Sequence, residues 1–436
     1  MDKKVIIFWF RRDLRLQDNV GFYKALNGKQ LVLPLFIFDT TILEKLPKED
    51  ARISFIFETL QALRKELQTY GSSLAIYYGN PKEVFSEITS RFEVQNVIAN
   101  HDYEPYAIKR DASISEFLSE KNIGFYTFKD QVIFEKAEII KEDGHPYVVY
   151  TPYSKRWLEQ LDASKHLKNN SPDDTFKNLY KNLQLPNVSL QEIGFCPSPI
   201  KVKPYNLSEK SIENYKHTRN FPSNVQGTSH LSPHLRFGTI SIRQLVAKAL
   251  QSKEQTFLKE LIWREFFMQI LWHFPKTESK AFKPKYDRIV WRNNETEFEA
   301  WKQGKTGYPF VDAGMRELKE TGYMHNRVRM IVASFLCKHL LIDWRWGEAH
   351  FAEKLLDYEQ ASNVGNWQWA AGSGVDAAPY FRIFNPTTQI EKFDKNMQYI
   401  RQWVPEYGTT NYPKPIVEHK EARERCLYVY KEALYE

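Results

Sequence analysis

Cysteine is scarce in this chain of 436 residues, and the three present, Cys196, Cys337 and Cys426, lie far apart. An odd number without short spacings fits neither a disulfide framework nor a zinc or iron–sulfur site. The sequence therefore predicts reduced thiols, no metal centre and a location in the cytoplasm.

Long apolar runs are also missing. None reaches the roughly 18 residues that a membrane-spanning helix requires, so no membrane partner is expected. The apolar stretch Val5–Phe10 is followed at once by Arg11, Arg12 and Asp13, which is unlike a signal peptide. Neither a GxGxxG nor a Walker sequence occurs, so any nucleotide must be bound by a different arrangement.

Positive charge and aromatic side chains are present in excess. The net charge of +7 and the pI of about 8.9 suit a polyanionic partner without requiring one. Nine of the eleven tryptophans follow residue 260. Tryptophan at this density can serve core packing, a platform that stacks on other rings, or a relay for electrons, and composition leaves all three open.

The first 130 residues alternate between strand and helix patterns, as in a parallel sheet covered by helices. Buried strands are expected at Val5–Phe10, Leu31–Phe38, Ser73–Tyr78 and Asn96–Ala99. Helices are expected at Ala51–Tyr70, from Pro81 onward and at Pro105–Lys121. We therefore predict a Rossmann-like α/β domain over residues 1–130.

Residues 131–204 are rich in Pro, Asn, Asp and Ser, which indicates a long linker over the surface that has room for short helices. Helical spacing then prevails to the end of the chain, with helices expected at Lys259–Trp272, Gly314–Thr321, Arg327–Leu341 and Phe351–Leu356. The sequence thus predicts a separate all-α domain over residues 205–436.

Two segments of this helical half combine residue types that suit a nucleotide. Gly227–Leu235 opens with small hydroxyl residues whose backbone N–H groups could bind a phosphate, although an ordinary helix cap explains them more simply. Glu260, Trp263 and Arg264 share one helix face, where they could hydrogen-bond a base edge and stack on it. A salt-bridged helix with a buried tryptophan explains that face equally well.

Two further segments point the same way. Asn326 and Met330 lie one turn apart and can meet in one pocket, while Arg327 can reach a backbone phosphate. A polar helix start is the simpler explanation of that segment alone. Trp367 and Trp369 cannot share a helix face, so they must meet different environments, and the Gly- and Asn-rich stretch around them favours function over plain core.

Together these stretches resemble the photolyase/cryptochrome family, and most closely its class I cyclobutane pyrimidine dimer photolyases. The resemblance runs from FWFRRDLRLQDN to PIVEHKEAR and includes QGKTGYPFVDAGMRELKETGYMHNRVRM and NWQWAAGSGVDAAPYFRIFNPTTQIEKFD. It implies an α/β antenna domain, a linker and a helical domain that binds FAD and DNA. It also implies light-driven electron transfer from reduced FAD to pyrimidine dimers flipped out of DNA.

The resemblance assigns residues to each role. Asn363 would face the flavin N5, where an amide cannot ionise. The residues that would bind FAD are Tyr215, Thr228, Ser229, His230, Leu231, Ser232, Arg264, Arg329, Asp357, Glu359 and Asn363. Those that would bind the lesion and its flanking phosphates are Arg219, Glu260, Trp263, Asn326, Arg327, Met330 and Trp369. The chain of tryptophans that would carry electrons to the flavin is Trp367, Trp344 and Trp291.

Two positions depart from the family pattern. Residue 359 is Glu, where class I relatives commonly carry Asp. Glu104 matches a folate-contacting acid, but Glu278 stands where folate-binding members have a basic residue. Because of Glu104, the expected antenna chromophore is 5,10-methenyltetrahydrofolate. Because of Glu278, a deazaflavin, another flavin or none are the alternatives.

The main alternative is a cryptochrome-type blue-light receptor with the same fold and flavin. It predicts a C-terminal tail and loss of some lesion-pocket residues, whereas Glu260, Trp263, Asn326, Met330 and Trp369 are all present. Repair of (6-4) photoproducts is less consistent with Asn326, since those enzymes resemble a pattern with a histidine pair there. The protein is expected to act as a monomer on DNA that contains pyrimidine dimers.

Overall fold

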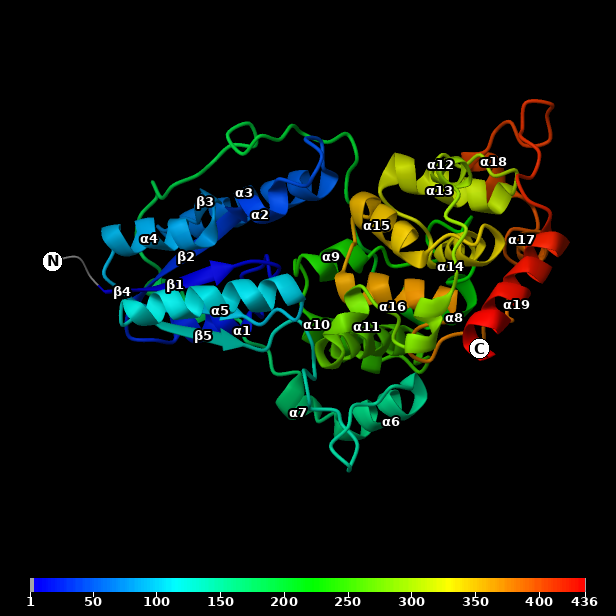
Figure 1. Cartoon of the computed structure of the whole chain (residues 1–436). Coiled ribbons are helices and arrows are strands. Elements are labelled where there is room, and N and C mark those ends of the chain that lie inside the picture. The colour runs from blue at the N-terminus through cyan, green and yellow to red at the C-terminus, as the bar shows by residue number, and fades with distance from the viewer. Residues whose placement is uncertain (1–3, 436) are drawn as a thin grey trace. The chain divides into compact units, whose positions relative to one another are not determined.

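Five parallel strands form one sheet in the computed structural model, which describes residues 4–435 (Figure 1). Their order is β3-β2-β1-β4-β5, and their bounds are β1 Val5–Phe10, β2 Leu31–Asp39, β3 Ala75–Gly79, β4 Val94–Asn100 and β5 Gly124–Phe128. Parallel strands are covered on both faces, which explains the continuous apolar runs of the sequence. The predicted strands are confirmed, but β5 was not predicted because this edge strand is only half-buried.

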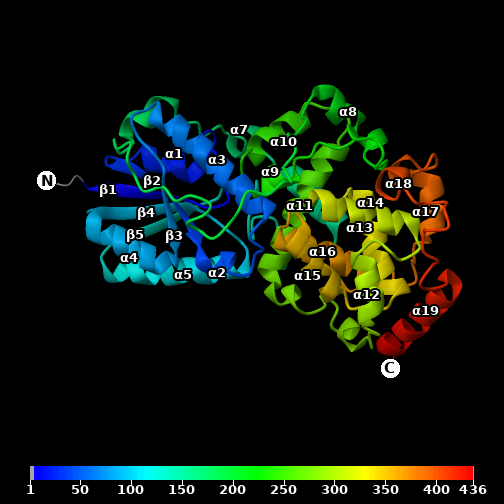
Figure 2. The same ribbon diagram turned by 90° about the horizontal axis from the view of Figure 1, so that it is seen from above.

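Helices cover both faces of the sheet (Figure 2). Ile6 and Phe8 pack with α1 (Val20–Leu26) and α3 (Ala51–Gln68). Ile7 and Trp9 point to the opposite face and pack with α4 (Pro81–Arg91) and α5 (Pro105–Glu120). The remaining helices of this unit are α2 Thr40–Leu43, α7 Ala163–His166, the 3₁₀ turn η1 Asp173–Asn178, α9 Ser232–Arg236 and α10 Ile242–Leu250.

The chain divides into two units, and both are built from separated segments. The first contains the chain up to Glu135 together with Leu161–Lys203 and Ser232–Lys248. The second contains Lys136–Gln160, Pro204–Leu231 and Ala249–Glu436.

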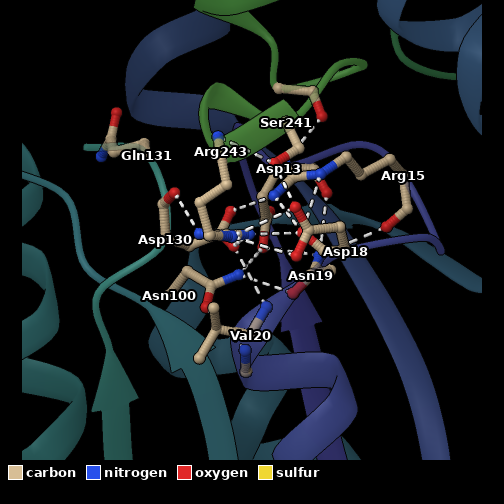
Figure 3. Close-up of polar contacts among 12 residues, drawn as sticks. Asp13, Arg15, Asp18, Asn19, Val20, Asn100, Asp130, Gln131, Ser241 and Arg243 are labelled. Carbon is tan, nitrogen blue, oxygen red and sulfur yellow. Dashed lines mark hydrogen bonds and ion pairs between the residues drawn. The ribbon is translucent and has the colours of Figure 1, made fainter. Parts of the chain in front are cut away.

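Buried ion pairs join the separated segments of the first unit (Figure 3). The guanidinium of Arg243 donates to Asp18 at 3.0 Å and to Asp130 at 2.8 Å, and Arg15 donates to Asp130 at 2.7 Å. Asp18 and Asp130 are 0% and 1% exposed. Burial opposes ionisation of Asp130, but Arg15 and Arg243 outweigh it and lower its pKa. The Ser232–Lys248 segment is thus tied to the sheet by charge.

The second unit is helical, and its central helix α11 (Thr256–His273) is buried on nearly all sides. Its buried apolar side chains, among them Leu258, Leu261, Ile262 and Phe266, fit this position in the core. The other elements are α6 Tyr150–Gln160, α8 Glu209–Thr218, η2 Pro275–Glu278, η3 Pro284–Arg288, α12 Glu295–Lys302, α13 Pro309–Thr321, α14 Asn326–Ser334, the π-turn η4 Phe335–His339, α15 Trp344–Lys354, α16 Gln360–Ala371, α17 Pro386–Phe393, α18 Gln398–Trp403 and α19 His419–Tyr435.

The predicted helices of this half are confirmed, with three corrections of extent. The segment Gly314–Thr321 is the C-terminal part of α13, and the helix expected at Arg327–Leu341 is α14 followed by the π-turn η4. The helix expected at Phe351–Leu356 is α15, which begins at Trp344 and ends at Lys354. The surface linker expected over residues 131–204 is wrong for α6, because Tyr153 and Trp157 are buried there. The indole Nε1 of Trp157 donates to Glu265 on α11 at 2.7 Å, so α6 is part of the helical core.

No helix within residues 4–435 is long and apolar enough to cross a membrane. All three cysteines are free thiols, and no cluster of metal-ligating side chains occurs in the same range.

Replacement of Arg243 by Met is expected to destabilise the first unit by about 3–5 kcal/mol, because buried Asp18 would lose the guanidinium that pairs with it and Asp130 would keep only Arg15. Urea unfolding measures this loss. The matched control is Lys201→Met, which breaks the exposed pair with Glu58 and should cost less than about 1 kcal/mol. Equal effects of the two changes would contradict the structural role of Arg243.

Candidate active site

A cavity enclosing about 600 Å³ of empty space, part of it open to solvent, lies among α14, α15 and α16 of the helical unit. Its lining contains the predicted residues Asn326, Arg329, Met330, Asp357, Glu359, Asn363, Trp367 and Trp369, together with Ala333, Phe351, Leu355, Tyr358, Ser362, Asn366 and Ala370. Folding therefore brings together residues that sequence reasoning had assigned to flavin and lesion alike.

An ion pair lies in the wall of this cavity. Arg329 donates to the Asp357 carboxylate at 2.8 Å and to the backbone oxygen of Met324 at 2.7 Å. Burial opposes the charge on Arg329, but Asp357 outweighs it and raises the pKa of the guanidinium. The second carboxylate oxygen of Asp357, Oδ1, is buried and has no hydrogen-bond partner among residues 4–435. A buried acceptor without a donor is costly, so a ligand with N–H or O–H groups fits this cavity.

Asn363 is held by a neighbour that the sequence did not indicate. Its amide nitrogen donates to the backbone oxygen of Glu348 at 3.1 Å and to the Glu348 carboxyl at 2.9 Å. Burial raises the pKa of Glu348, while hydrogen bonds from Asn363 and Tyr358 oppose that shift. These two acceptors fix which end of the amide is nitrogen, so the Asn363 oxygen is directed away from Glu348.

The side chain of Glu359 also lines this cavity. It is buried and accepts from Arg264 on α11 at 3.5 Å and from the Ser362 hydroxyl at 2.9 Å. The departure noted at position 359 therefore keeps a carboxylate beside a guanidinium. Glu265, the neighbour of Arg264, is instead bonded to Trp157, as described above.

The three tryptophans of the predicted chain belong to one packed cluster of the helical unit. Trp344 and Trp367 are buried within it, and Trp291 packs against it while half-buried. Trp367 fits over Gly347, where a Cβ atom would lie only 2.1 Å from the indole ring. A side chain at position 347 would therefore displace Trp367 from its place in the cavity wall.

The run from Thr228 to Ser232 has a constrained backbone. His230 adopts a left-handed φ of 54°, and its ring lies against Tyr323 at 5.4 Å. Thr228 forms a side-chain hydrogen bond with Tyr323, whose pKa burial raises to about 12. Ser229 accepts from the Asn206 backbone N–H at 2.9 Å, Leu231 is buried, and Ser232 is the first residue of α9.

Tyr215 on α8 is not part of the cavity lining described above. Its ring packs against Phe257 at 5.4 Å, and the Arg219 guanidinium lies 5.3 Å from the ring centre. Burial raises its pKa, and the charge of Glu260 adds to that shift. Tyr215 is therefore near the predicted lesion-binding pair Arg219 and Glu260.

Arg219 and Glu260 form an ion pair with each other, and both side chains are partly exposed. Arg327 lies nearby and donates to Asn220 at 2.6 Å. Burial lowers the pKa of Arg327, and the like charges of Arg219 and Arg382 lower it further. A group of guanidiniums with one carboxylate among them attracts a polyanion. Arg382 was not singled out, although it lies inside the quoted stretch APYFRIFNP.

The predicted antenna residue lies in the first unit. Glu104 is the N-cap residue of α5, and its carboxylate pairs with Arg12 at 3.0 Å and with Arg236 at 2.5 Å. Glu278, in the second unit, accepts from Gln360 at 3.2 Å. Both acids are thus engaged within the chain.

Comparison with known proteins matches this arrangement. Residues 6–173 match a family model described as DNA photolyase, and residues 257–410 match the FAD binding domain of DNA photolyase. The deoxyribodipyrimidine photo-lyase of Alkalihalophilus pseudofirmus is 36% identical over 97% of this chain and 97% of its own.

Solved structures agree with the sequence matches. A bacterial class III photolyase from Agrobacterium tumefaciens superposes with a TM-score of 0.89 at 34% identity, covering 100% of this chain and 99% of its own. An archaeal photolyase from Sulfolobus tokodaii with two FAD molecules gives a TM-score of 0.82 at 34% identity, covering 98% and 100%. Full-length similarity at this level is decisive, and this chain belongs to the DNA photolyase family.

Proposed function

We propose that this chain repairs DNA with light, using FAD to split cyclobutane pyrimidine dimers. The observation that carries the proposal is the cavity of the helical unit, whose wall combines the Arg329–Asp357 pair, an unpartnered buried carboxylate oxygen and the amide of Asn363. Family membership and relatives named deoxyribodipyrimidine photo-lyase support it.

When bound and reduced, FAD supplies the light-driven electron donor that opens the bonds joining the two pyrimidines and takes the electron back. The residues of the chain would bind the cofactor and orient it. Arg329 and Asp357 would offer one positive group and one acceptor to the ring system, and Asn363 would offer its oxygen while Glu348 holds its nitrogen. Because Asn363 cannot ionise, it can accept a hydrogen bond without supplying an acid. Tyr215, Arg264, Glu359 and the Thr228–Ser232 run would hold the rest of the cofactor.

Lesion recognition would use the neighbouring side chains. Trp263 and Trp369 would stack on the flipped rings, worth about 1–3 kcal/mol per base. Glu260 and Asn326 would bind base edges, Met330 would fill the space between them, and Arg219 and Arg327 would hold phosphates. Flipping a dimer costs only a few kcal/mol because its pairing is already disturbed.

The antenna chromophore remains a prediction. Folate was expected because Glu104 matches a folate-contacting acid, and the Glu104 carboxylate forms ion pairs with Arg12 and Arg236. The similarity to the Sulfolobus tokodaii photolyase with two FAD molecules keeps a second flavin as the alternative. We also propose residues 1–130 as the antenna domain, 131–204 as the linker, apart from α6, which packs in the helical unit, and 205–436 as the catalytic domain, apart from Ser232–Lys248, which packs with the first unit. Membership of class I, the monomeric state and the cytoplasmic location stay predictions from the sequence.

Illumination of the reduced protein with an oligonucleotide that contains one thymine dimer tests the function. Restored thymines under blue light, with none in darkness, are the expected result. Dimers that persist in blue light, with the flavin bound and reduced, would refute the proposal.

Glu260→Ala is expected to weaken binding of the dimer-containing oligonucleotide by about 10- to 150-fold, since loss of a charged hydrogen bond costs about 1.5–3 kcal/mol. Flavin content should not change. Glu254→Ala, which removes an acid paired with Lys216, is the matched control. Unchanged lesion affinity in Glu260→Ala would remove this residue from the lesion site.

Asp357→Asn should make the protein lose FAD more readily, because Arg329 would then lack its carboxylate. The ratio of flavin to protein absorbance after gel filtration measures the loss, and a drop of severalfold is expected. Glu353→Gln, an exposed change on α15, serves as control. Full flavin content in both variants would argue against a role for Asp357 in cofactor binding.

Trp291→Phe should slow photoreduction of oxidised flavin while sparing repair by protein that was reduced beforehand. Flavin absorbance during illumination with an external reductant measures photoreduction. The oligonucleotide assay measures repair. Trp272→Phe is the control, since Trp272 is a half-buried residue of α11 beyond the predicted chain. Photoreduction at the original rate in Trp291→Phe would show that electrons take another route.

A further inference from the structure

Trp263, one of the predicted lesion-stacking residues, already has one ring stacked on it. Its indole lies parallel to the phenol of Tyr150, with ring centres 3.7 Å apart and an angle of 5° between the planes. Phe266 meets Trp263 edge-on at 5.5 Å. The indole is only partly buried, so some of its surface remains open beside this aromatic group.

Tyr150 is fixed on both sides. Its hydroxyl donates to the backbone oxygen of Lys259 at 2.8 Å. In an α-helix that oxygen also accepts the N–H four residues later, which here belongs to Trp263. The Tyr150 backbone N–H donates to Asp376 at 3.2 Å, in the loop between α16 and α17. Tyr150 therefore contacts both the ring of Trp263 and the turn of α11 that carries it.

The phenol stays a neutral hydrogen-bond donor. Burial raises the pKa of Tyr150, and the charge of Glu260 adds to the shift, with Arg219 opposing it. Tyr150 is 9% exposed. Its ring thus lies within electrostatic range of the Glu260–Arg219 pair, although it comes from a segment that the sequence indicated as a surface linker.

Since Tyr150 covers one face of Trp263, a base can stack only on the remaining surface of the indole. We propose that Tyr150 is a positioning residue for lesion recognition, which holds Trp263 in a single plane and leaves one side of the indole for the pyrimidine dimer. This inference rests on the proposed function. It adds a residue of α6 to the lesion pocket.

Tyr150→Leu tests the stack, and Tyr150→Phe tests the hydroxyl alone. With an oligonucleotide that contains one thymine dimer, we expect Tyr150→Leu to weaken binding about three- to tenfold, the range of an aromatic pair. Tyr150→Phe should stay within about twofold. Affinity for the undamaged oligonucleotide should be unchanged, because phosphate contacts dominate it.

Two readouts separate positioning from general damage to the fold. Flavin content and repair per absorbed photon at saturating DNA should equal those of the unchanged protein, so that only the half-saturating lesion concentration moves. In a Trp263→Leu background, Tyr150→Leu should have almost no further effect. If Tyr150→Leu does not fold, Tyr150→His, which keeps a smaller planar ring, should weaken lesion binding by an intermediate factor.

Equal losses from Tyr150→Leu in the presence and absence of Trp263 would overturn the inference, as would a parallel loss of affinity for undamaged DNA. Unchanged lesion affinity in Tyr150→Leu would do the same. In those cases the unchanged protein still prefers and repairs the dimer, and the proposed function stands. If the unchanged protein shows no preference for the dimer, the proposed function is lost, and this inference with it.

Discussion

A charge removed from water needs an opposite charge beside it, and this requirement organises both units of the protein. In the first unit it joins Arg243 to Asp18 and Asp130, which lie far away along the chain. In the helical unit it joins Arg329 to Asp357 and Arg264 to Glu359. Each pair costs desolvation, which the partner and its hydrogen bonds must offset. Buried arginines therefore mark the places where chain segments have to meet.

The same requirement separates structural groups from ligand-binding ones. Asp18 and Asp130 accept hydrogen bonds at both oxygens, so nothing further is needed there. Asp357 accepts at one oxygen, and the other is buried in the wall of a cavity without a partner among residues 4–435. A buried carboxylate oxygen without a donor is destabilising in a packed core. In a binding site, a bound ligand can supply the missing hydrogen bond.

Much of the fold could be predicted because local patterns determine it. The apolar runs of β1 and β2 and the long helix at Ala51–Gln68 follow from hydrophobic periodicity alone. Helix α6 could not, because its segment is rich in proline and polar residues, and its burial depends on contact with α11, which is far away in the sequence. Packing against a distant part of the chain, rather than local composition, determines the position of α6.

The site was predicted in part, and for a different reason. Asn326 and Met330 could be paired from helical spacing, whereas the shared role of Arg329 and Asp357 in binding FAD came only from family resemblance. Glu348, Tyr150 and Arg382 carried no signal of their own. Glu348 matters through the amide of Asn363, and Tyr150 through the face of Trp263. Residues that act through another residue are visible only when both are placed in space.

Three arginines lie near the proposed lesion-binding residue Glu260 or are coupled by charge to one that does. Burial lowers the pKa of Arg327, and repulsion by the charges of Arg219 and Arg382 lowers it further. Glu260 neutralises Arg219 in the protein alone. DNA phosphates would relieve the repulsion among the arginines, and a dimer would offer Glu260 a base edge in place of Arg219. Undamaged DNA provides only the first of these two exchanges. On the proposed function, we therefore expect discrimination to depend on whether the flipped bases give Glu260 a hydrogen bond that replaces its weakened bond to Arg219.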